Sequence, residues 1–131
     1  RDAVRYDWRT VLDGMFEKES KTESDYFVNE RLRQFYEKKD FGRYAREDGK
    51  LPTCFLSNND ITGGNSGSPV LNGRGELIGV NFDRTWLSTM SDIAFDPAFC
   101  RNIALDIRYV LFVIDRIGDA SYLFEEMDFA E

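Results

Sequence analysis

The sequence of 131 residues contains no histidine, and this absence limits its chemistry more than any other feature. Imidazole is the side chain that most often takes a proton near neutral pH, so a serine nucleophile here would lack its usual general base. The chain therefore cannot complete a Ser-His-Asp triad by itself. Three explanations stay open: the histidine lies on another part of a longer polypeptide, a lysine acts as the base, or no serine is catalytic.

Long apolar runs and excess positive charge are also missing. No apolar run approaches the ~20 residues that a transmembrane helix needs, so we expect no membrane partner. The net charge of −7 argues against a nucleic-acid-binding surface. The apolar content of 42%, with eleven Phe, is nevertheless sufficient for a hydrophobic core, which argues against a disordered chain.

Cysteine is scarce, and the first residues of the given sequence show no signal-like segment. Cys54 and Cys100 are far apart in sequence, so a disulfide and two buried free thiols stay equally open. The chain starts with Arg1-Asp2-Ala3-Val4, without an initiator Met or a signal-like segment. We therefore expect an excised piece or a mature product whose targeting information is absent.

The richest stretch runs from Asp60 to Arg84 and reads D-I-T-G-G-N-S-G-S-P-V-L-N-G-R-G-E-L-I-G-V-N-F-D-R. Ser66 lies in its glycine-rich bend, and glycines permit backbone angles that turn successive N–H groups to one side. Ser66 is therefore the candidate nucleophile, and the N–H groups of Gly64 and Ser66 are the candidate oxyanion hole. Residues 70–71 and 76–82 are predicted to form a β-hairpin around the turn 72–75.

The letters G-N-S-G-S-P resemble the G-[DN]-S-G-[GS]-P signature of chymotrypsin-like serine peptidases. An α/β-hydrolase nucleophile elbow is excluded because a strand, not a helix, is predicted next. A phosphate-binding loop is excluded because no Lys-Ser/Thr pair follows the glycines. A glycine-rich turn that only reverses the chain is the remaining alternative. Chymotrypsin-like chains place His and Asp before Ser and carry the serine on the second of two barrels, as expected for a piece without histidine.

Other helices and strands are predicted from the spacing of apolar residues and from the residues that begin or end such elements. The predicted strands are an interrupted strand over 11–16, a buried strand over 54–57, a short strand over 92–95 and an extended segment over 101–107. A helix is predicted from Ser24 to about Lys39, and a second one over 106–117 that ends at Gly118. Residues 86–91 are predicted to be an irregular loop, and the apolar residues of 122–127 to pack in the core.

A wider set of motifs resembles one peptidase family. The set comprises N-x-D-I-T-G-G-N-S-G-S-P-V-L-N, G-E-L-I-G-x-x-F-D-R, D-I-A-F, D-I-R-Y-V-L-F-V-I-D and the segment Phe41-Gly42-Arg43-Tyr44-Ala45. Together these resemble the end of the dipeptidyl-peptidase 7 and dipeptidyl-peptidase 11 family, and they cover nearly the whole chain. Members are bacterial, largely periplasmic serine exopeptidases that release dipeptides from free peptide N-termini.

The resemblance implies a fold and a place in a longer protein. We expect a mainly β fold with flanking helices, namely the second β-barrel of a chymotrypsin-like double-barrel serine peptidase. Residues 1–131 would be the C-terminal portion of the catalytic domain, comprising the second barrel and a C-terminal helix. The first barrel, an inserted helical domain and the catalytic His and Asp would lie upstream, so the chain alone is expected to be inactive. The expected location is the bacterial periplasm or cell surface.

The resemblance also assigns roles to four residues. It places the nucleophile on Ser66 and the oxyanion donors on the N–H groups of Gly64 and Ser66. Asp83 would hold the substrate's α-ammonium group, although an ordinary turn aspartate is the alternative. At this position the dipeptidyl-peptidase 11-like members of the family carry a sequence that resembles F-D-R, and the dipeptidyl-peptidase 7-like members one that resembles F-D-G. This chain has F-D-R, with Arg84 as the arginine. Its guanidinium would bind Asp or Glu in the second substrate position.

The sequence therefore predicts a serine dipeptidyl-peptidase that prefers Asp or Glu, with no metal and no organic cofactor. Its partners would be peptides with free N-termini and the upstream part of its own polypeptide; a homodimer is left open. One alternative is a dipeptidyl-peptidase 7-like enzyme with apolar preference, in which Arg84 points away from the pocket and pairs with Asp83 or Asp92. The other is a catalytically dead barrel that serves as an interaction or dimerisation domain.

Overall fold

The computed structural model describes residues 7–130, which divide into two compact units. The first unit contains the described residues up to Thr10 together with Cys54–Asp106. The second contains Val11–Thr53 and the described residues from Ile107 onward. Each unit has a hydrophobic core of its own.

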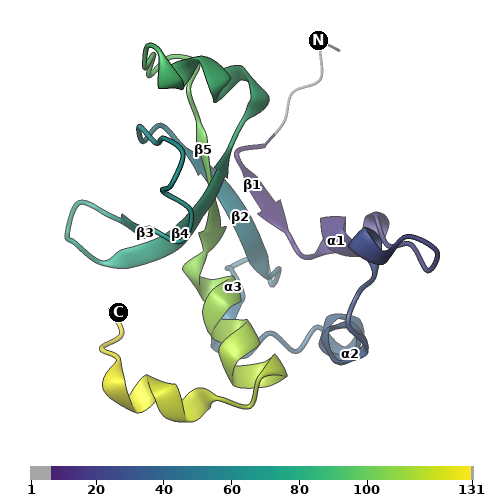
Figure 1. Ribbon diagram of the computed structural model, residues 1–131. Helices are drawn as coiled ribbons and strands as arrows, with labels where there is room; N and C mark the ends of the chain where they lie inside the picture. Colours follow the sequence, from purple (N-terminus) through teal and green to yellow (C-terminus); the bar gives the residue numbers. More distant parts are fainter. Residues whose placement is uncertain (1–6, 131) are drawn as a thin grey trace. The chain divides into compact units, whose positions relative to one another are not determined.

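A five-stranded sheet makes up most of the first unit, as the ribbon in Figure 1 shows. Its strands are β1 (Arg9–Val11), β2 (Pro52–Ser57), β3 (Pro69–Leu71), β4 (Leu77–Arg84) and β5 (Asn102–Asp106), in the spatial order β1-β2-β5-β4-β3. The pairs β2–β5, β5–β4 and β4–β3 are antiparallel. The predicted hairpin is thus confirmed as β3 and β4.

Local turn chemistry explains why the hairpin forms at residues 72–76. The side-chain oxygen of Asn72 accepts from the backbone N–H groups of Arg74 (2.9 Å) and Glu76 (3.1 Å). Gly75 has φ = +79°, a conformation that favours glycine. The hydrogen bond from Arg74, and to a smaller extent the one from Asn72, lowers the pKa of the Glu76 carboxyl to about 2. The turn is therefore specified by its own residues.

The buried face of this sheet is built around an aromatic ring that covers a glycine. Phe55, Val70 and Ala104 are buried together, and Ile78 packs against them. Gly79 lies beneath the ring of Phe55, and a Cβ at that position would lie 2.8 Å from the ring and 2.8 Å from the carbonyl oxygen of Leu105. The ring can pack this closely only because residue 79 has no side chain.

The second unit is helical. It contains α1 (Asp13–Glu17), a 3₁₀ turn (Ser24–Tyr26), α2 (Glu30–Lys38), a 3₁₀ turn (Gly42–Tyr44), α3 (Ile107–Phe112) with its π-helical continuation (Val113–Ile117), and a 3₁₀ helix (Ser121–Glu126). Asn29 caps α2 by accepting from the N–H groups of Arg31 and Leu32. Within residues 7–130, no helix is long and apolar enough to cross a membrane.

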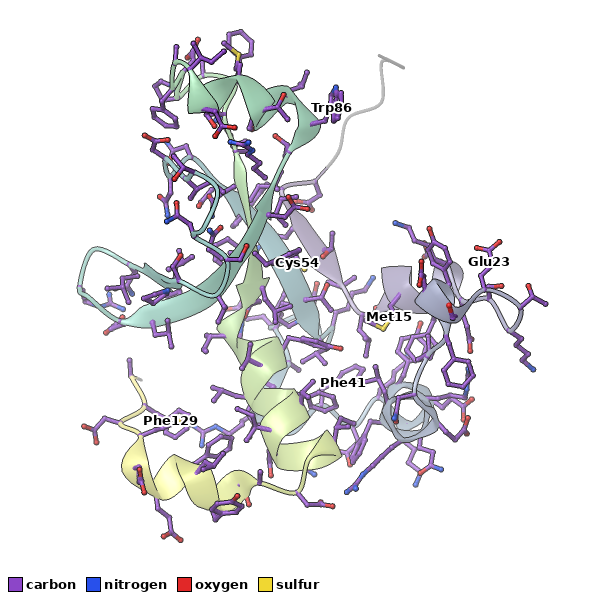
Figure 2. The ribbon with its side chains drawn as sticks, in the orientation of Figure 1. Met15, Glu23, Phe41, Cys54, Trp86 and Phe129 are labelled. Atoms are coloured by element: carbon purple, nitrogen blue, oxygen red, sulfur yellow. The ribbon has the colours of Figure 1, made fainter. Side chains whose placement is uncertain are left out.

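Phe112 is the centre of the second core. Its side chain is fully buried and makes edge-to-face contacts with Phe35, Phe41 and Tyr44. Figure 2 labels Phe41 beside α3. The hydroxyl of Tyr44 donates to Asp115 (2.8 Å), and burial together with this hydrogen bond raises the pKa of Tyr44 to about 12. The Phe41–Ala45 motif therefore has a packing role in this unit.

Four predicted elements are wrong, each for a local reason. Residues 86–91, predicted as an irregular loop, belong to a 3₁₀ helix. Residues 11–16 are not one strand, because β1 ends at Val11 and α1 begins at Asp13. The helix predicted from Ser24 begins only at Glu30, where Asn29 supplies the cap. Residues 92–95 form no strand: Trp86–Asp92 is a 3₁₀ helix, and the N–H groups of Ile93 and Ala94 both donate to Met90. Helical segments also take more of the chain than a mainly β fold implies.

Gly79→Ala should destabilise the intact protein by about 1–3 kcal/mol, because the new methyl group would overlap the Phe55 ring and the Leu105 carbonyl. Thermal or urea unfolding of the two proteins measures the difference. Gly73→Ala is the matched control, since nothing lies within 4 Å of a Cβ at that position. Equal stability of the Gly79 and Gly73 variants would contradict the close packing of Phe55 on β4.

Candidate active site

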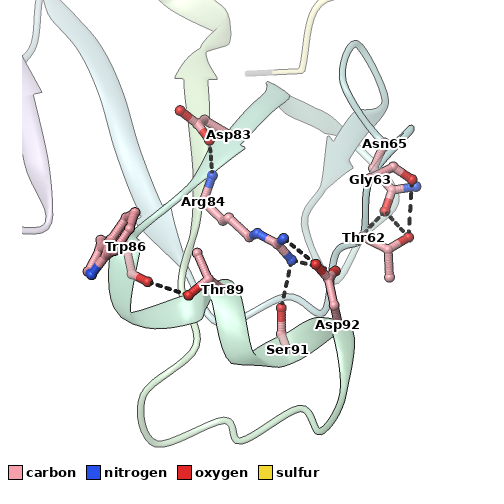
Figure 3. A network of polar contacts seen from close by, with 9 residues as sticks. All are labelled: Thr62, Gly63, Asn65, Asp83, Arg84, Trp86, Thr89, Ser91 and Asp92. Carbon is pink, nitrogen blue, oxygen red and sulfur yellow. Dashed lines mark hydrogen bonds and ion pairs between the residues drawn. The ribbon is translucent and has the colours of Figure 1, made fainter.

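Ser66 lies in the second of two consecutive tight turns in the loop that joins β2 to β3. The N–H of Asn65 donates to Thr62 (3.3 Å) and the N–H of Ser68 donates to Asn65 (3.0 Å). The side-chain oxygen of Asn65 also accepts from the N–H of Thr62 (2.7 Å), as drawn in Figure 3. Gly64 and Gly67 have φ values of +94° and +86°. Glycine is favoured at both positions, which confirms the tight glycine-rich bend predicted around Ser66.

The loop leaves Ser66 and two amides free to meet a ligand. Ser66 is exposed, and its hydroxyl lies 3.5 Å from the carbonyl oxygen of Phe82, at the limit of a hydrogen bond. Within residues 7–130, the N–H groups of Gly64 and Ser66 have no acceptor, whereas the N–H of Gly67 donates to Asn81 (2.8 Å). The two amides predicted for the oxyanion hole are therefore available for a ligand atom.

An open pocket brings three predicted residues together. Ser66, Asp83 and Arg84 all contribute to its lining, along with Gly63 and Phe82. Gly64 is not part of that lining. The end of β4 thus lies against the serine loop, and the predicted nucleophile shares one pocket with both predicted substrate-binding residues.

A β-bulge at Phe82 decides which way these residues face. On β5, Asn81 pairs with Ala104, Asp83 with Ile103 and Arg84 with Asn102, so Phe82 has no partner of its own. Because strand side chains alternate between faces, the extra residue shifts the alternation by one. Arg84 therefore shares a face with Asn81, and Asp83 belongs to the other face. In Figure 3 the side chains of Asp83 and Arg84 point away from each other.

Arg84 already has a carboxylate partner. Its two terminal nitrogens donate to the two oxygens of Asp92 at 2.7 and 2.5 Å, and one of them also donates to Ser91 (3.1 Å) (Figure 3). These hydrogen bonds lower the pKa of the Asp92 carboxyl and raise that of the Arg84 guanidinium. The predicted alternative of an Arg84–Asp92 pair is thus confirmed as a contact, while Arg84 is also among the residues that line the pocket.

Asp83 contacts the backbone of its neighbour in sequence. One of its carboxylate oxygens accepts from the backbone N–H of Arg84 at 2.8 Å, and the residue is otherwise exposed. A carboxylate accepts more than one hydrogen bond, so Asp83 keeps capacity for a cationic ligand group. Its position in the pocket wall is compatible with the predicted role in binding an ammonium group.

The segment that carries Asp92 is tied to the sheet by a buried serine. Ser88 is 2% exposed; its hydroxyl donates to the carbonyl oxygen of Arg101 (3.1 Å) and accepts from the N–H of the same residue (2.6 Å). The N–H of Thr85 also donates to the carbonyl oxygen of Arg101 (3.0 Å). These bonds close the long connection between β4 and β5 at its base, so Asp92 is presented from an anchored segment.

Two buried asparagines beside the loop are absent from the predicted site. Asn81 on β4 is 2% exposed and Asn102 on β5 is 1% exposed. Asn81 lines the pocket of Ser66, and both asparagines line a second depression on the loop that also includes Asn65 and Ser68. Their one sequence signal is an asparagine inside a predicted strand, where asparagine is uncommon.

Neither thiols nor acidic clusters add to the site. Cys54 and Cys100, both within the described part of the chain, are not joined by a disulfide. Among residues 7–130, no group of three or more Cys, Asp or Glu side chains is arranged to hold a metal ion.

Comparisons with known proteins agree on one family. The family profile described as Peptidase S46 matches residues 1–129. The chain is 53% identical over 131 residues to a dipeptidyl-peptidase 7 of Phocaeicola vulgatus, covering 100% of this chain and 18% of that protein. It is 55% identical over 126 residues to an Asp/Glu-specific dipeptidyl-peptidase of Capnocytophaga gingivalis, covering 96% of this chain and 18% of that protein.

A solved structure shares the fold. The crystal structure of Porphyromonas endodontalis DPP11 in complex with the dipeptide Arg-Asp matches with a TM-score of 0.92 and 47% identity, over 96% of this chain and 18% of that one. The antiparallel sheet with its helices is therefore the fold of a segment of that protein. The chain spans about 18% of the length of the curated relatives named above.

Proposed function

Because the chain belongs to the peptidase S46 family, we propose that it is part of a serine-type dipeptidyl-peptidase that releases dipeptides from free peptide N-termini. The names of both relatives support a dipeptidyl-peptidase, and the matched crystal structure contains a dipeptide. The observation that carries the proposal is the pocket that joins Ser66 to Asp83 and Arg84.

The catalytic base comes from outside this chain. The sequence has no histidine, and it spans about 18% of its relatives' length, so there is ample polypeptide to supply a His and an Asp. In this proposal residues 1–131 are the C-terminal portion of the catalytic domain, and their sheet forms the second barrel of a chymotrypsin-like pair. An open sheet with β1 and β3 at its edges is compatible with that assignment.

Ser66 attacks the carbonyl carbon of the second peptide bond, and the amides of Gly64 and Ser66 donate to the developing oxyanion. The exposed hydroxyl and the two amides without acceptors in the described chain support these roles. Donors that are in place before the reaction stabilise the negative charge without further reorganisation. A catalytically dead interaction domain would have no use for this arrangement.

Asp83 binds the α-ammonium group of the substrate. A carboxylate in the site pairs with the ammonium group of a free peptide N-terminus. A substrate with a blocked N-terminus leaves that carboxylate desolvated and unpaired, so the exopeptidase binds it less well. The position of Asp83 in the wall of the Ser66 pocket supports this role. Its existing bond to the N–H of Arg84 helps to orient the carboxylate.

Arg84 binds an Asp or Glu side chain in the second substrate position. Its place in the pocket wall, the F-D-R sequence and the Asp/Glu-specific relative support this preference. Two observations favour the apolar alternative. Asp92 already neutralises the guanidinium of Arg84, and another relative of similar identity is a dipeptidyl-peptidase 7. An acidic side chain therefore has to share Arg84 with Asp92 or displace it.

In the intact enzyme, a fluorophosphonate probe should label Ser66, and Ser66→Ala should abolish labelling and lower kcat by on the order of 10⁵–10⁶. The 131-residue chain alone should react slowly, since it contains no imidazole. Ser68→Ala is the matched control and should keep both labelling and activity. Absence of labelling in the intact enzyme would support a dead domain, and fast labelling of the isolated chain would identify a different base.

Asp83→Ala should reduce kcat/KM for substrates with a free N-terminus by on the order of 10²–10³, because the ammonium group loses its counter-charge. The same substrates with an acetylated N-terminus provide the internal comparison, since they have no ammonium group to lose. Equal losses on free and acetylated substrates would show that Asp83 does not anchor the amine.

Arg84→Gly should lower kcat/KM for dipeptidyl substrates that end in Asp or Glu by on the order of 10²–10⁴. Substrates that end in Leu or Met have no charge-assisted bond to lose, so their cleavage should hold steady or rise. Arg84→Lys keeps the charge without the planar fork and should restore only part of the activity.

Two results would overturn the acidic preference. A uniform loss on all four substrates would show that Arg84 has a structural role, as its bonds to Asp92 and Ser91 permit. A wild-type enzyme that already prefers Leu or Met would establish the dipeptidyl-peptidase 7-like alternative.

A further inference from the structure

Three hydrogen-bonded polar side chains lie together on one face of the sheet. Ser57 on β2, Asn102 on β5 and Asn81 on β4 occupy the face that also carries Phe55, Val70 and Ala104. Asn81 and Asn102 are almost fully buried. Burying a polar side chain is unfavourable unless it is hydrogen-bonded. The hydrogen-bond partners of these side chains therefore decide what the buried group does.

Their hydrogen bonds form a single directed chain. The hydroxyl of Ser57 donates to Oδ1 of Asn102, whose Nδ2 donates to Oδ1 of Asn81 at 3.2 Å. Nδ2 of Asn81 in turn donates to the backbone carbonyl oxygen of Asn65 at 3.3 Å. Reversing the Asn102 amide would place its oxygen against Oδ1 of Asn81, and reversing the Asn81 amide would place two NH₂ groups face to face, so each link fixes the orientation of the next. The chain ends on the residue directly before Ser66.

The backbone of Asn81 holds the other side of the same loop. Its carbonyl oxygen accepts from the N–H of Gly67 (2.8 Å), and its N–H donates to the carbonyl oxygen of Ser68 (2.9 Å). Together with the side-chain bond to Asn65, one buried residue contacts the chain immediately before and immediately after Ser66. Ser66 itself is left exposed.

We propose that the Ser57–Asn102–Asn81 chain is a positioning device that sets the backbone around Ser66 for attack, an inference that rests on the nucleophile role proposed above. The bulge at Phe82 and the bonds of Asn81 place the loop against the end of β4. The side-chain link restrains the Asn65 carbonyl, and with it the peptide group whose N–H belongs to Ser66 and is the proposed oxyanion donor. Losing that link leaves the Asn65 carbonyl held by the N–H of Ser68 alone, so this peptide group is less restrained while the Ser66 hydroxyl stays present.

Asn81→Asp in the intact enzyme is the decisive variant, because it keeps the shape and the acceptor for Asn102 but replaces the donor to Asn65 with a carboxylate oxygen. We expect kcat, and the rate of fluorophosphonate labelling of Ser66, to fall by on the order of 10- to 100-fold with KM little changed. Asn58→Asp, the same change at an exposed position, is the matched control and should keep wild-type rates.

The pH dependence of the rate tests whether the lost donor causes the deficit. A buried carboxyl has a raised pKa, so the aspartate introduced at position 81 takes up a proton as the pH falls and regains a donor. The rate deficit relative to wild type should therefore narrow at lower pH; because protonation also relieves the folding cost of the buried charge, the rates are compared well below the unfolding temperature of both proteins. Ser57→Ala, at the far end of the chain, should give a smaller, several-fold loss that does not depend on pH.

The outcomes distinguish this inference from the function on which it rests. If the wild-type enzyme is not labelled at Ser66, the nucleophile proposal fails and the positioning role fails with it. If the wild type is labelled and Asn81→Asp matches it in rate, the positioning role alone is wrong. A deficit in Asn81→Asp that tracks loss of thermal stability and does not narrow at low pH also overturns it.

Discussion

The pairing of β4 with β5, interrupted by the bulge at Phe82, is the constraint on which the candidate site depends. Before the bulge, the alternation of β4 puts Asn81 on the buried face, where its amide reaches the serine loop. After the bulge, the alternation is shifted by one, so Arg84 and not Asp83 continues that face. A regular strand would exchange the two charged residues and change which of them faces Asp92 and Ser91.

The electrostatics of the site follow from that geometry. One guanidinium, that of Arg84, lies within reach of Asp92 through two short hydrogen bonds, and Asp83 bonds to the backbone of the same residue. Holding a long arginine side chain in one orientation removes conformational freedom before a ligand arrives, which lowers the entropy cost of binding. The same pair reduces the net positive charge that a ligand carboxylate meets. Orientation and charge therefore act in opposite directions on affinity for acidic side chains.

The second unit shows that a family-like motif need not contain a functional site. Phe41 and Tyr44 pack on Phe112, and the Tyr44 hydroxyl is satisfied by Asp115. Between them, Gly42 has φ = +52°, and a Cβ there would lie 3.0 Å from the Arg116 guanidinium. Close packing and an unusual backbone angle explain the aromatic and glycine positions of Phe41–Ala45 without a ligand.

The sequence by itself determined the features that depend on near neighbours. Turn residues and period-two patterns specify the β3–β4 hairpin, and the glycine-rich bend around Ser66 is readable because each backbone angle is set within a few residues. The absence of histidine needs no structure at all. The adjacency of Asp83 and Arg84 was likewise visible, and the structure places both in the Ser66 pocket.

Only the tertiary structure decided the bulge at Phe82, the Asp92 partner of Arg84 and the link from Ser57 through Asn102 and Asn81 to the loop. Each depends on the register between strands or on a segment remote in sequence. Residues 92–95 illustrate the limit: their composition suits a strand, but amides bonded to Met90 leave them in a turn. A one-residue shift in register reverses every side chain on a strand, and local sequence patterns carry no record of it.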